Sequence, residues 1–167
     1  MPGRTPEKNA QQLLSDAWST DGGGIVVVPV DPVQIARSLG IAVRTAHMKE
    51  DFSGALEKGP GDDPVIYLNE RDSQNRQRFS CAHELGHYYL RTLEGQVSYS
   101  FVDRRERMAR TGTDPDEIYA NQFGAALIMP ADAVKRLSRR FNPVQLAYRF
   151  RVSEEAMRFR LGNLGLL

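Results

Sequence analysis

The segment His83-Glu84-Leu85-Gly86-His87 decides how this sequence of 167 residues is interpreted. It lies in a stretch whose apolar spacing predicts one long helix over residues 72–92. Residues four apart lie one above the other on a helix, so the two imidazoles can converge on one ion. Glu84 lies about 100° around the helix from His83, within reach of a water beside that ion. The pattern therefore predicts a metal site with Glu84 as its general base.

A surface helix with two solvated histidines is the alternative to a metal site. Two of the 3 histidines of the chain lie in this motif. The flanking residues Phe79, Ala82 and Tyr89 are apolar or aromatic, which predicts a buried helix. Because buried imidazoles need polar partners, the sequence favours the metal site.

A zinc site needs a third protein ligand, and no histidine follows His87. The third ligand must then be a carboxylate or Cys81. Cys81 lies about 200° around the helix from His83, so we interpret it as a small core residue. The carboxylates that follow the motif are Glu94, Asp103, Glu106, Asp114, Asp116 and Glu117.

Glu117 stands out among these carboxylates because Ala120, Asn121 and Gly124 share its helix face. Such small or short residues allow a second helix to press against the metal helix while Glu117 reaches the ion. The same glutamate is also the third residue after Asp114, the position that closes a capping box. The spacing supports a ligand and a cap equally.

The remaining pattern predicts an α+β fold with a small sheet covered by helices. Further helices are expected over residues 6–19, 31–39 and 114–129, and short strands over 41–46, 52–57 and 65–68. Residues 93–113 are polar and charged, so we interpret them as a mobile connection with a short helix near 103–110. Two or three short helices follow from residue 131.

Composition excludes several classes of protein. The single cysteine rules out an internal disulfide framework and fits a reducing compartment. Residues 25–28 form the longest apolar run, far too short to cross a membrane, and residues 1–6 lack the apolar stretch of a signal peptide. The formal net charge of +1 argues against a protein that binds polyanions with its whole surface. We therefore expect a cytoplasmic protein without a membrane partner.

The charge is unevenly distributed along the chain. Residues 130–167 carry eight Lys or Arg against three Asp or Glu, a net charge of +5, so residues 1–129 carry −4. Residues 146–161 have the pattern of a turn and second helix of a helix-turn-helix, which would contact DNA. A helical hairpin that closes the core is the favoured alternative, and a docking surface for a regulator is a third.

The sequence resembles the ImmA/IrrE family of zincin-type metallopeptidases. The matching motifs are Arg76-x-Arg78-Phe79-Ser80-x-Ala82-His83-Glu84-Leu85-Gly86-His87 and Glu117-x-x-Ala120-Asn121-x-Phe123-Gly124-Ala125-x-Leu127-Ile128-Met129-Pro130. The resemblance implies a zincin-like metallopeptidase domain over residues 1–130, with a mainly antiparallel three-stranded sheet packed on the motif helix. Residues 131–167 would form a basic helical tail, either helix-turn-helix-like or a hairpin that closes the core.

The same resemblance implies one zinc ion held by His83, His87 and Glu117, with Glu84 catalytic, and so favours the ligand role of Glu117. Gly124 departs from the alanine that is commoner in the family, a change in packing and not in chemistry. The implied function is a zinc endopeptidase that cleaves a regulatory protein, in this family a helix-turn-helix repressor of a mobile element or stress regulon. Two alternatives are a non-proteolytic metal-bound partner or toxin–antitoxin component, and a DNA-binding regulator that uses the basic tail.

The hypothetical mechanism is hydrolysis of a peptide bond with Glu84 as the base. We expect the substrate to lie extended along a sheet edge, and residues 93–113 to form either a lid or a surface loop. The donor that stabilises the oxyanion is not identifiable from the sequence. The candidates are Tyr88, Tyr89, Tyr119 and the arginines between residues 104 and 110.

Overall fold

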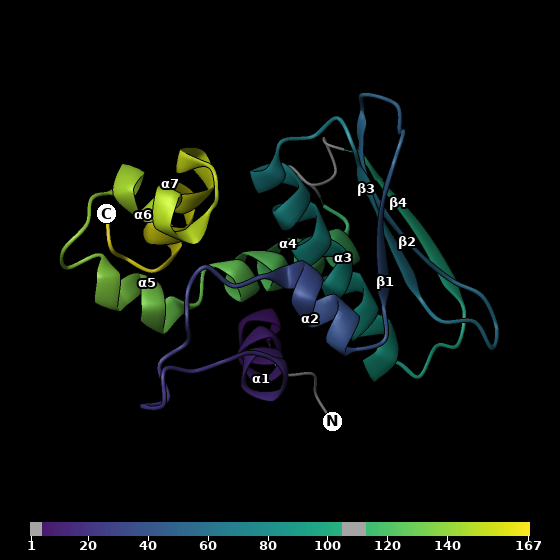
Figure 1. The fold of residues 1–167 in the computed structure, drawn as a ribbon, viewed down its shortest axis with the longest axis horizontal. Coiled ribbons are helices and arrows are strands. Elements are labelled where there is room, and N and C mark those ends of the chain that lie inside the picture. Colours follow the sequence, from purple (N-terminus) through teal and green to yellow (C-terminus); the bar gives the residue numbers. More distant parts are fainter. Residues whose placement is uncertain (1–4, 105–112) are drawn as a thin grey trace.

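A small sheet and a set of helices form the described part of the computed structural model, residues 5–104 and 113–167. Figure 1 shows the sheet at one end, helices α1–α4 in the middle and α5–α7 at the other end. The elements are α1 (Pro6–Ala17), α2 (Pro32–Ser38), β1 (Ala42–Ala46), β2 (Phe52–Lys58), β3 (Val65–Asn69), α3 (Gln74–Leu93), β4 (Tyr99–Arg104), α4 (Pro115–Ile128), α5 (Ala131–Leu137), α6 (Pro143–Phe150) and α7 (Glu154–Asn163). The α+β class predicted from the sequence is confirmed.

Side-chain caps fix where the two helices of the predicted site begin. Ser73 accepts a hydrogen bond from Arg76 N at the start of α3. Asp114 accepts one from Asp116 N at the start of α4, and Pro115 occupies the first helical position. These residues satisfy backbone N–H groups that have no partner inside the helix. Both helices therefore start within two residues of the predicted positions.

The sheet has four strands in the order β1-β3-β2-β4, and it is mixed. β1 pairs with β3 in parallel, whereas β2 pairs with β3 and β4 in antiparallel fashion. The sheet is mainly antiparallel, as predicted, but it has four strands where three were expected, and the parallel pairing of β1 was not foreseen. Parallel pairing joins strands that are distant in sequence, so the sequence pattern alone does not reveal it.

The fourth strand, β4, lies within residues 93–113, which the sequence pattern suggested were a mobile connection. Among the side chains described for this strand, those of residues 99–102, Tyr99 and Phe101 alternate inward and pack against the core, while Val102 is 45% exposed. The alternation is short and interrupts a polar segment, so it gives no clear period of two. The short helix predicted near residues 103–110 falls mostly outside the described residues, and residues 103–104 belong to β4.

One hydrophobic cluster runs through the sheet and through both sets of helices. It includes Leu13 of α1, Ile66 of β3, Leu85 of α3, Phe123 of α4 and Phe150 of α6. The division of the chain at residue 130 stays a prediction, but the apolar sides of α6 and α7 contribute to the same core as the sheet. Among the described residues, no helix combines the length and apolar character needed to cross a membrane.

Polar contacts also attach the C-terminal helices to the remainder of the molecule. Arg160 of α7 is 6% exposed, donates through Nε to Met129 O at 2.9 Å and pairs with both carboxylate oxygens of Glu7 at 2.7 and 2.9 Å. Arg78 of α3 donates to the carbonyl oxygens of Val30 and Phe150. The basic tail therefore supplies at least one of its arginines to the interior.

Candidate metal centre

The two histidines of the motif lie side by side in the interior, one turn apart on α3. Both are fully buried, and their Nε2 atoms are 3.1 Å apart. Their rings meet edge to face, with centroids 4.8 Å apart. This is the arrangement that the spacing of four residues predicted, with both imidazoles directed at one point.

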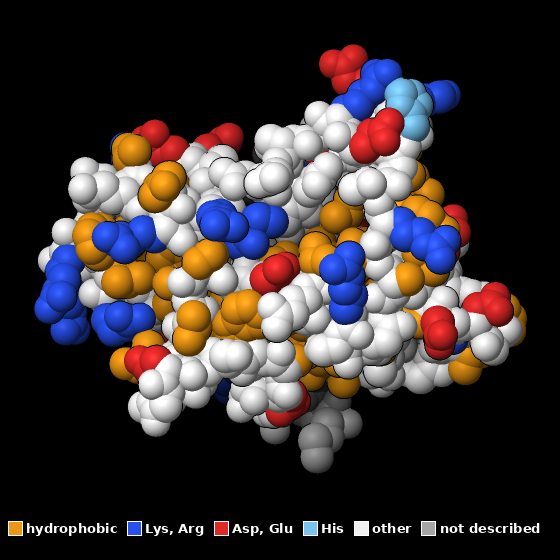
Figure 2. Space-filling view, viewed as in Figure 1, with side chains coloured by type: hydrophobic (Ala, Val, Ile, Leu, Met, Phe, Trp, Pro, Cys, Tyr) orange, Lys and Arg blue, Asp and Glu red, His pale blue; other side chains and the backbone are white. Residues whose placement is uncertain are grey.

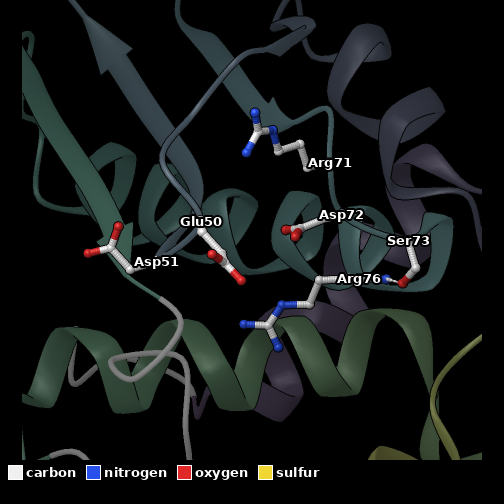
Figure 3. Close-up of a pocket in the computed structure, with 6 residues that line it drawn as sticks. All are labelled: Glu50, Asp51, Arg71, Asp72, Ser73 and Arg76. Carbon is white, nitrogen blue, oxygen red and sulfur yellow. Dashed lines mark hydrogen bonds between the residues drawn. The ribbon is translucent and has the colours of Figure 1, made fainter.

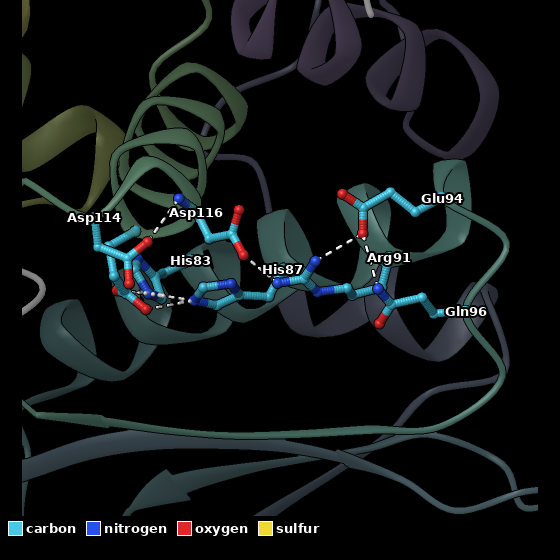
Figure 4. A network of polar contacts seen from close by, with 8 residues as sticks. His83, His87, Arg91, Glu94, Gln96, Asp114 and Asp116 are labelled. Atoms are coloured by element: carbon cyan, nitrogen blue, oxygen red, sulfur yellow. Dashed lines mark hydrogen bonds and ion pairs between the residues drawn. The ribbon is translucent and has the colours of Figure 1, made fainter.

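Helix α4 brings Glu117 to the same point. Its Oε2 lies 3.2 Å from His83 Nε2, and its Oε1 lies 3.2 Å from His87 Nε2. Figure 4 shows His83 and His87 on α3 near Asp114 and Asp116, at the start of α4. The helix is capped by Asp114, which accepts from Asp116 N. The carboxylate of Glu117 thus lies with the histidines, as a ligand would.

The three side chains fit a tetrahedral zinc ion by their chemistry and by their spacing. Zinc–nitrogen and zinc–oxygen bonds of about 2.0–2.1 Å in a tetrahedron place neighbouring donor atoms about 3.3 Å apart. The observed separations are 3.1 and 3.2 Å. One donor atom from each of His83, His87 and Glu117 lies within 4.8 Å of the others. Imidazole and carboxylate donors also accept other divalent ions, so the three residues could hold a metal ion without fixing which metal it is.

Asn121 holds His83 in the orientation that metal binding requires. Its Oδ1 lies 2.9 Å from His83 Nδ1, so the ring N–H at that position donates to the amide oxygen. The Nε2 lone pair is then directed toward His87 and Glu117, where a metal ion would lie. Sequence reasoning assigned Asn121 only to a face of small residues. The signal that could have revealed its role is its position four residues after Glu117, on the same helix face.

Close packing of α3 on α4 depends on two glycines. A Cβ at Gly86 would lie 2.8 Å from Ala120 Cα, and one at Gly124 would lie 3.0 Å from His83 N. Both distances are too short for a methyl group without a backbone shift. Gly86 thus meets the backbone of α4, and Gly124 meets the backbone of His83, a predicted ligand. The backbones of the two helices therefore fix the separation of Glu117 from the histidines.

Glu84 is fully buried on the side of α3 that faces the sheet. A Cβ at Gly54 of β2 would lie 3.0 Å from Glu84 Oε1 and 3.3 Å from Tyr67 O. The carboxylate therefore occupies space that a larger residue on β2 would fill. Glu84 follows His83 in the chain, about 100° around the helix, so its carboxylate does not share the direction in which the two imidazoles converge.

Arg91 of α3 contacts both α4 and β4. Its guanidinium pairs with Glu94 at 2.6 Å and with Asp116, and it lies 5.0 Å from the ring centroid of Phe101. Phe101 in turn stacks on His87, with centroids 4.5 Å apart and an interplanar angle of 10°. Partial burial acts to lower the pKa of Arg91, but the bonds to Glu94 and Asp116 raise it overall. Two of the other candidate carboxylates are thus engaged with Arg91 (Figure 4).

The tyrosine candidates for oxyanion stabilisation pack against other residues. Tyr119 accepts a hydrogen bond from Asn9 Nδ2 at 2.7 Å, and burial raises its pKa. Tyr89 lies against Phe123, with ring centroids 5.4 Å apart, and Tyr88 packs on the core. The arginines at 105, 107 and 110, like the side chain of Arg104, lie outside the described residues. No tyrosine is therefore assigned as the donor.

A separate hollow of about 810 Å³ lies beside the start of α3 (Figure 3). Its lining carries both signs of charge and comprises Glu50, Asp51, Arg71, Asp72, Ser73 and Arg76. Arg76 donates to Ser53 Oγ at 3.2 Å, which ties this wall to β2. The metal-ligand candidates are not among its lining residues, so we do not assign the chemistry to this hollow.

A comparison with models of known protein families finds a match over most of the chain. The family model described as the IrrE N-terminal-like domain, of Peptidase M78, matches residues 36–162. This chain belongs to that family. The match covers both motif helices and most of the C-terminal helices, so the resemblance drawn from the two sequence motifs is confirmed.

Of two further comparisons, the one with solved structures finds a match, and it supports the fold alone. A comparison with curated proteins finds no match. A solved structure of a "Mycobacterium tuberculosis transcriptional regulator" is similar, with a TM-score of 0.62 and 16% sequence identity. The alignment covers 93% of this chain and 46% of that one, so the chain spans less than half the length of this structural relative.

Proposed function

We propose that this member of the IrrE N-terminal-like family is a zinc-dependent endopeptidase that cleaves a regulatory protein. The observation that carries the proposal is the convergence of His83, His87 and Glu117 on one buried point, with Glu84 buried on the same helix directly after His83. Two imidazoles and one carboxylate leave a fourth tetrahedral position for water or substrate, as in catalytic zinc sites. The expected cytoplasmic location stays a prediction from the single cysteine.

The residues of the chain have separate roles in this proposal. A zinc ion held by His83, His87 and Glu117 would polarise the scissile carbonyl and make a water molecule more acidic. Glu84 takes the proton from the attacking water and passes it to the amine that leaves. Asn121 keeps the His83 ring in the required tautomer through its 2.9 Å contact with Nδ1.

The substrate we propose is a helix-turn-helix regulator of the kind associated with this family. β4 is an edge strand because it comes last in the sheet order. It contacts α3, since Phe101 of β4 stacks on His87. An extended segment that paired with β4 would run past the two histidines. Addition of a strand at this edge therefore supports cleavage of a protein chain.

The arrangement of α7 argues against the alternative in which the tail reads DNA. A recognition helix contacts bases with its first residues, and α7 begins with Glu154 and Glu155, which phosphates repel. Arg160 is buried against Glu7, and Arg158 pairs with Glu154 at 2.8 Å. Both arginines of the helix are engaged within the protein.

The decisive experiment compares the zinc-loaded protein with its Glu84→Gln variant, each incubated with a candidate helix-turn-helix regulator. We expect new fragments of the regulator with the unaltered protein and none with the variant, although both bind zinc. If neither protein yields fragments and both inhibit DNA binding by the regulator equally, the protein acts as a metal-bound partner or toxin–antitoxin component without proteolysis.

A further inference from the structure

A groove of about 600 Å³ lies where the C-terminal helices meet the start of α3. Its polar lining residues are Gln74, Asn75, Arg136, Tyr148, Arg149 and Arg151. The three arginines come from α5, from α6 and from the residue after α6. Figure 2 shows Lys and Arg side chains over and beside the region that α5–α7 occupy in Figure 1. The groove is separate from the metal centre and from the hollow of mixed charge.

The groove is electropositive. No acidic side chain is among its lining residues. In the described ranges 5–104 and 113–167, Arg136, Arg149 and Arg151 form no ion pair with a carboxylate. Three guanidinium groups around one groove repel each other, and an anionic ligand would remove this cost.

The side chain of one arginine and the backbone of another are held in place before any ligand arrives. The Arg149 guanidinium lies 3.7 Å from the ring centroid of Phe141, a cation–π contact. Arg151 has a φ of 52°, and its carbonyl oxygen accepts a hydrogen bond from Arg78 Nε at 3.3 Å. Preorganised side chains lose less entropy when they bind, so these contacts suit a binding surface.

Apolar groups lie beside the arginines on α6. Tyr148 is 86% exposed, and Val144, four residues earlier on the same helix face, is 53% exposed. Exposed Tyr and Arg together are typical of the residues that dominate protein–protein binding. Contact with a sugar–phosphate backbone gives no role to an apolar side chain such as Val144.

We propose that this groove binds an acidic segment of a partner protein. A short acidic segment needs only the local positive charge of the groove. A long nucleic acid would extend past it over residues 1–129, which carry a net charge of −4, and past Glu154 and Glu155. The charge distribution and the exposed Tyr148 therefore favour a protein as the occupant.

The position of the groove relates it to the metal centre. Gln74 and His83 lie on the same helix, and nine residues at about 1.5 Å rise each place them about 14 Å apart along its axis. About four extended residues span that length. A partner held in the groove would have a neighbouring segment within reach of the metal centre. Binding itself requires no catalysis, so this inference goes beyond the proposed peptidase function.

The test measures binding of a fluorescein-labelled peptide of glutamate, aspartate and glycine to the full chain by fluorescence polarisation at physiological ionic strength. We expect the double substitution Arg149→Glu and Arg151→Glu to weaken binding by about tenfold or more. The matched control is Arg139→Glu with Arg140→Glu, which removes the same charge at exposed positions outside the groove. The control should change binding by less than about twofold.

Two additional variants keep the result interpretable. Arg136→Glu alters an exposed side chain of α5 and leaves the contact of Arg149 with Phe141 intact, so it should weaken binding even if the double variant is poorly folded. Glu84→Gln should bind the peptide as the unaltered protein does, which separates docking from catalysis. Absence of peptide binding, equal losses in both double variants, or tighter binding of a DNA duplex that the groove substitutions abolish would overturn the proposal.

Discussion

The α3–α4 interface and the α5–α7 region differ in how closely they pack and in how far their polar side chains are exposed to solvent. At the interface, the backbones meet at Gly86 and Gly124, and His83, Glu84 and His87 are fully buried. In the C-terminal region, seven of the eight basic side chains are exposed. Arg160 is the exception, buried against Glu7. Donor atoms that must meet within about 0.5 Å of their target need rigid support. A surface that recognises a partner needs accessible charge.

The largest expected effect lies in the interface. Glu117→Ala removes one of three donors, so zinc affinity should fall by more than the about 100-fold that loss of a supporting residue causes. Asp116→Ala is the matched control, since it removes the neighbouring carboxylate, which pairs with Arg91. Competition with a chelator measures the affinity. Unchanged zinc binding by the Glu117 variant would assign that residue to helix capping.

Substitution of one helical glycine in each region tests whether the α3–α4 interface is packed more closely than the surface of α7. Gly86→Ala should destabilise the protein by about 3 kcal/mol, because the added methyl meets the backbone of Ala120. Gly162→Ala in α7 should stabilise it by about 0.5–1 kcal/mol, because the nearest atom to its Cβ is Leu167 Cδ1 at 3.7 Å. Denaturant unfolding measures both. Equal effects would show that the two regions pack alike.

The buried ion pair tests how the tail is attached. Arg160→Met should cost about 2 kcal/mol, less than for a fully buried pair because the side chain of Glu7 is 34% exposed. Arg158→Met removes the exposed pair with Glu154 and should cost less than about 0.5 kcal/mol. Thermal unfolding compares the two variants. A similar small loss in both would mean that apolar packing alone attaches the tail.

The smallest expected effect concerns orientation within the interface. Asn121→Ala should weaken zinc binding by about tenfold, or about 1.4 kcal/mol, because His83 loses its partner at Nδ1. Asn121→Asp, which keeps an acceptor at this position, should restore most of the affinity. Calorimetric titration with zinc measures both. If Asp restores nothing, the hydrogen bond does not orient the ring.

The sequence predicted the site more completely than the sheet. The spacing of His83 and His87 requires only a helix to bring the two rings together, so a local pattern was sufficient. The role of Glu117 was left open by spacing, because its position serves a cap as well as a ligand. The structure places its carboxylate oxygens 3.2 Å from the two histidines, although the role as ligand stays a proposal.

The missed features all depend on contacts between distant segments. β4 contributes Tyr99 and Phe101 to the core, and the strand meets the predicted site where Phe101 stacks on His87. Position 54 likewise favours glycine because a Cβ there would crowd the Glu84 carboxylate, which comes from a distant helix. Neither of these two contacts produces a periodic pattern of apolar residues in the sequence of its own segment.

The sequence by itself determined the motif helix, the pair of histidines, the family and the uneven charge, because each is a property of neighbouring residues. Only the tertiary structure decided that β1 pairs with β3, that Asn121 orients His83 and that Arg160 turns inward to Glu7. It also decided that three arginines from separate elements line one groove. Such contacts join residues far apart in the chain, and packing of the whole core selects them over local alternatives.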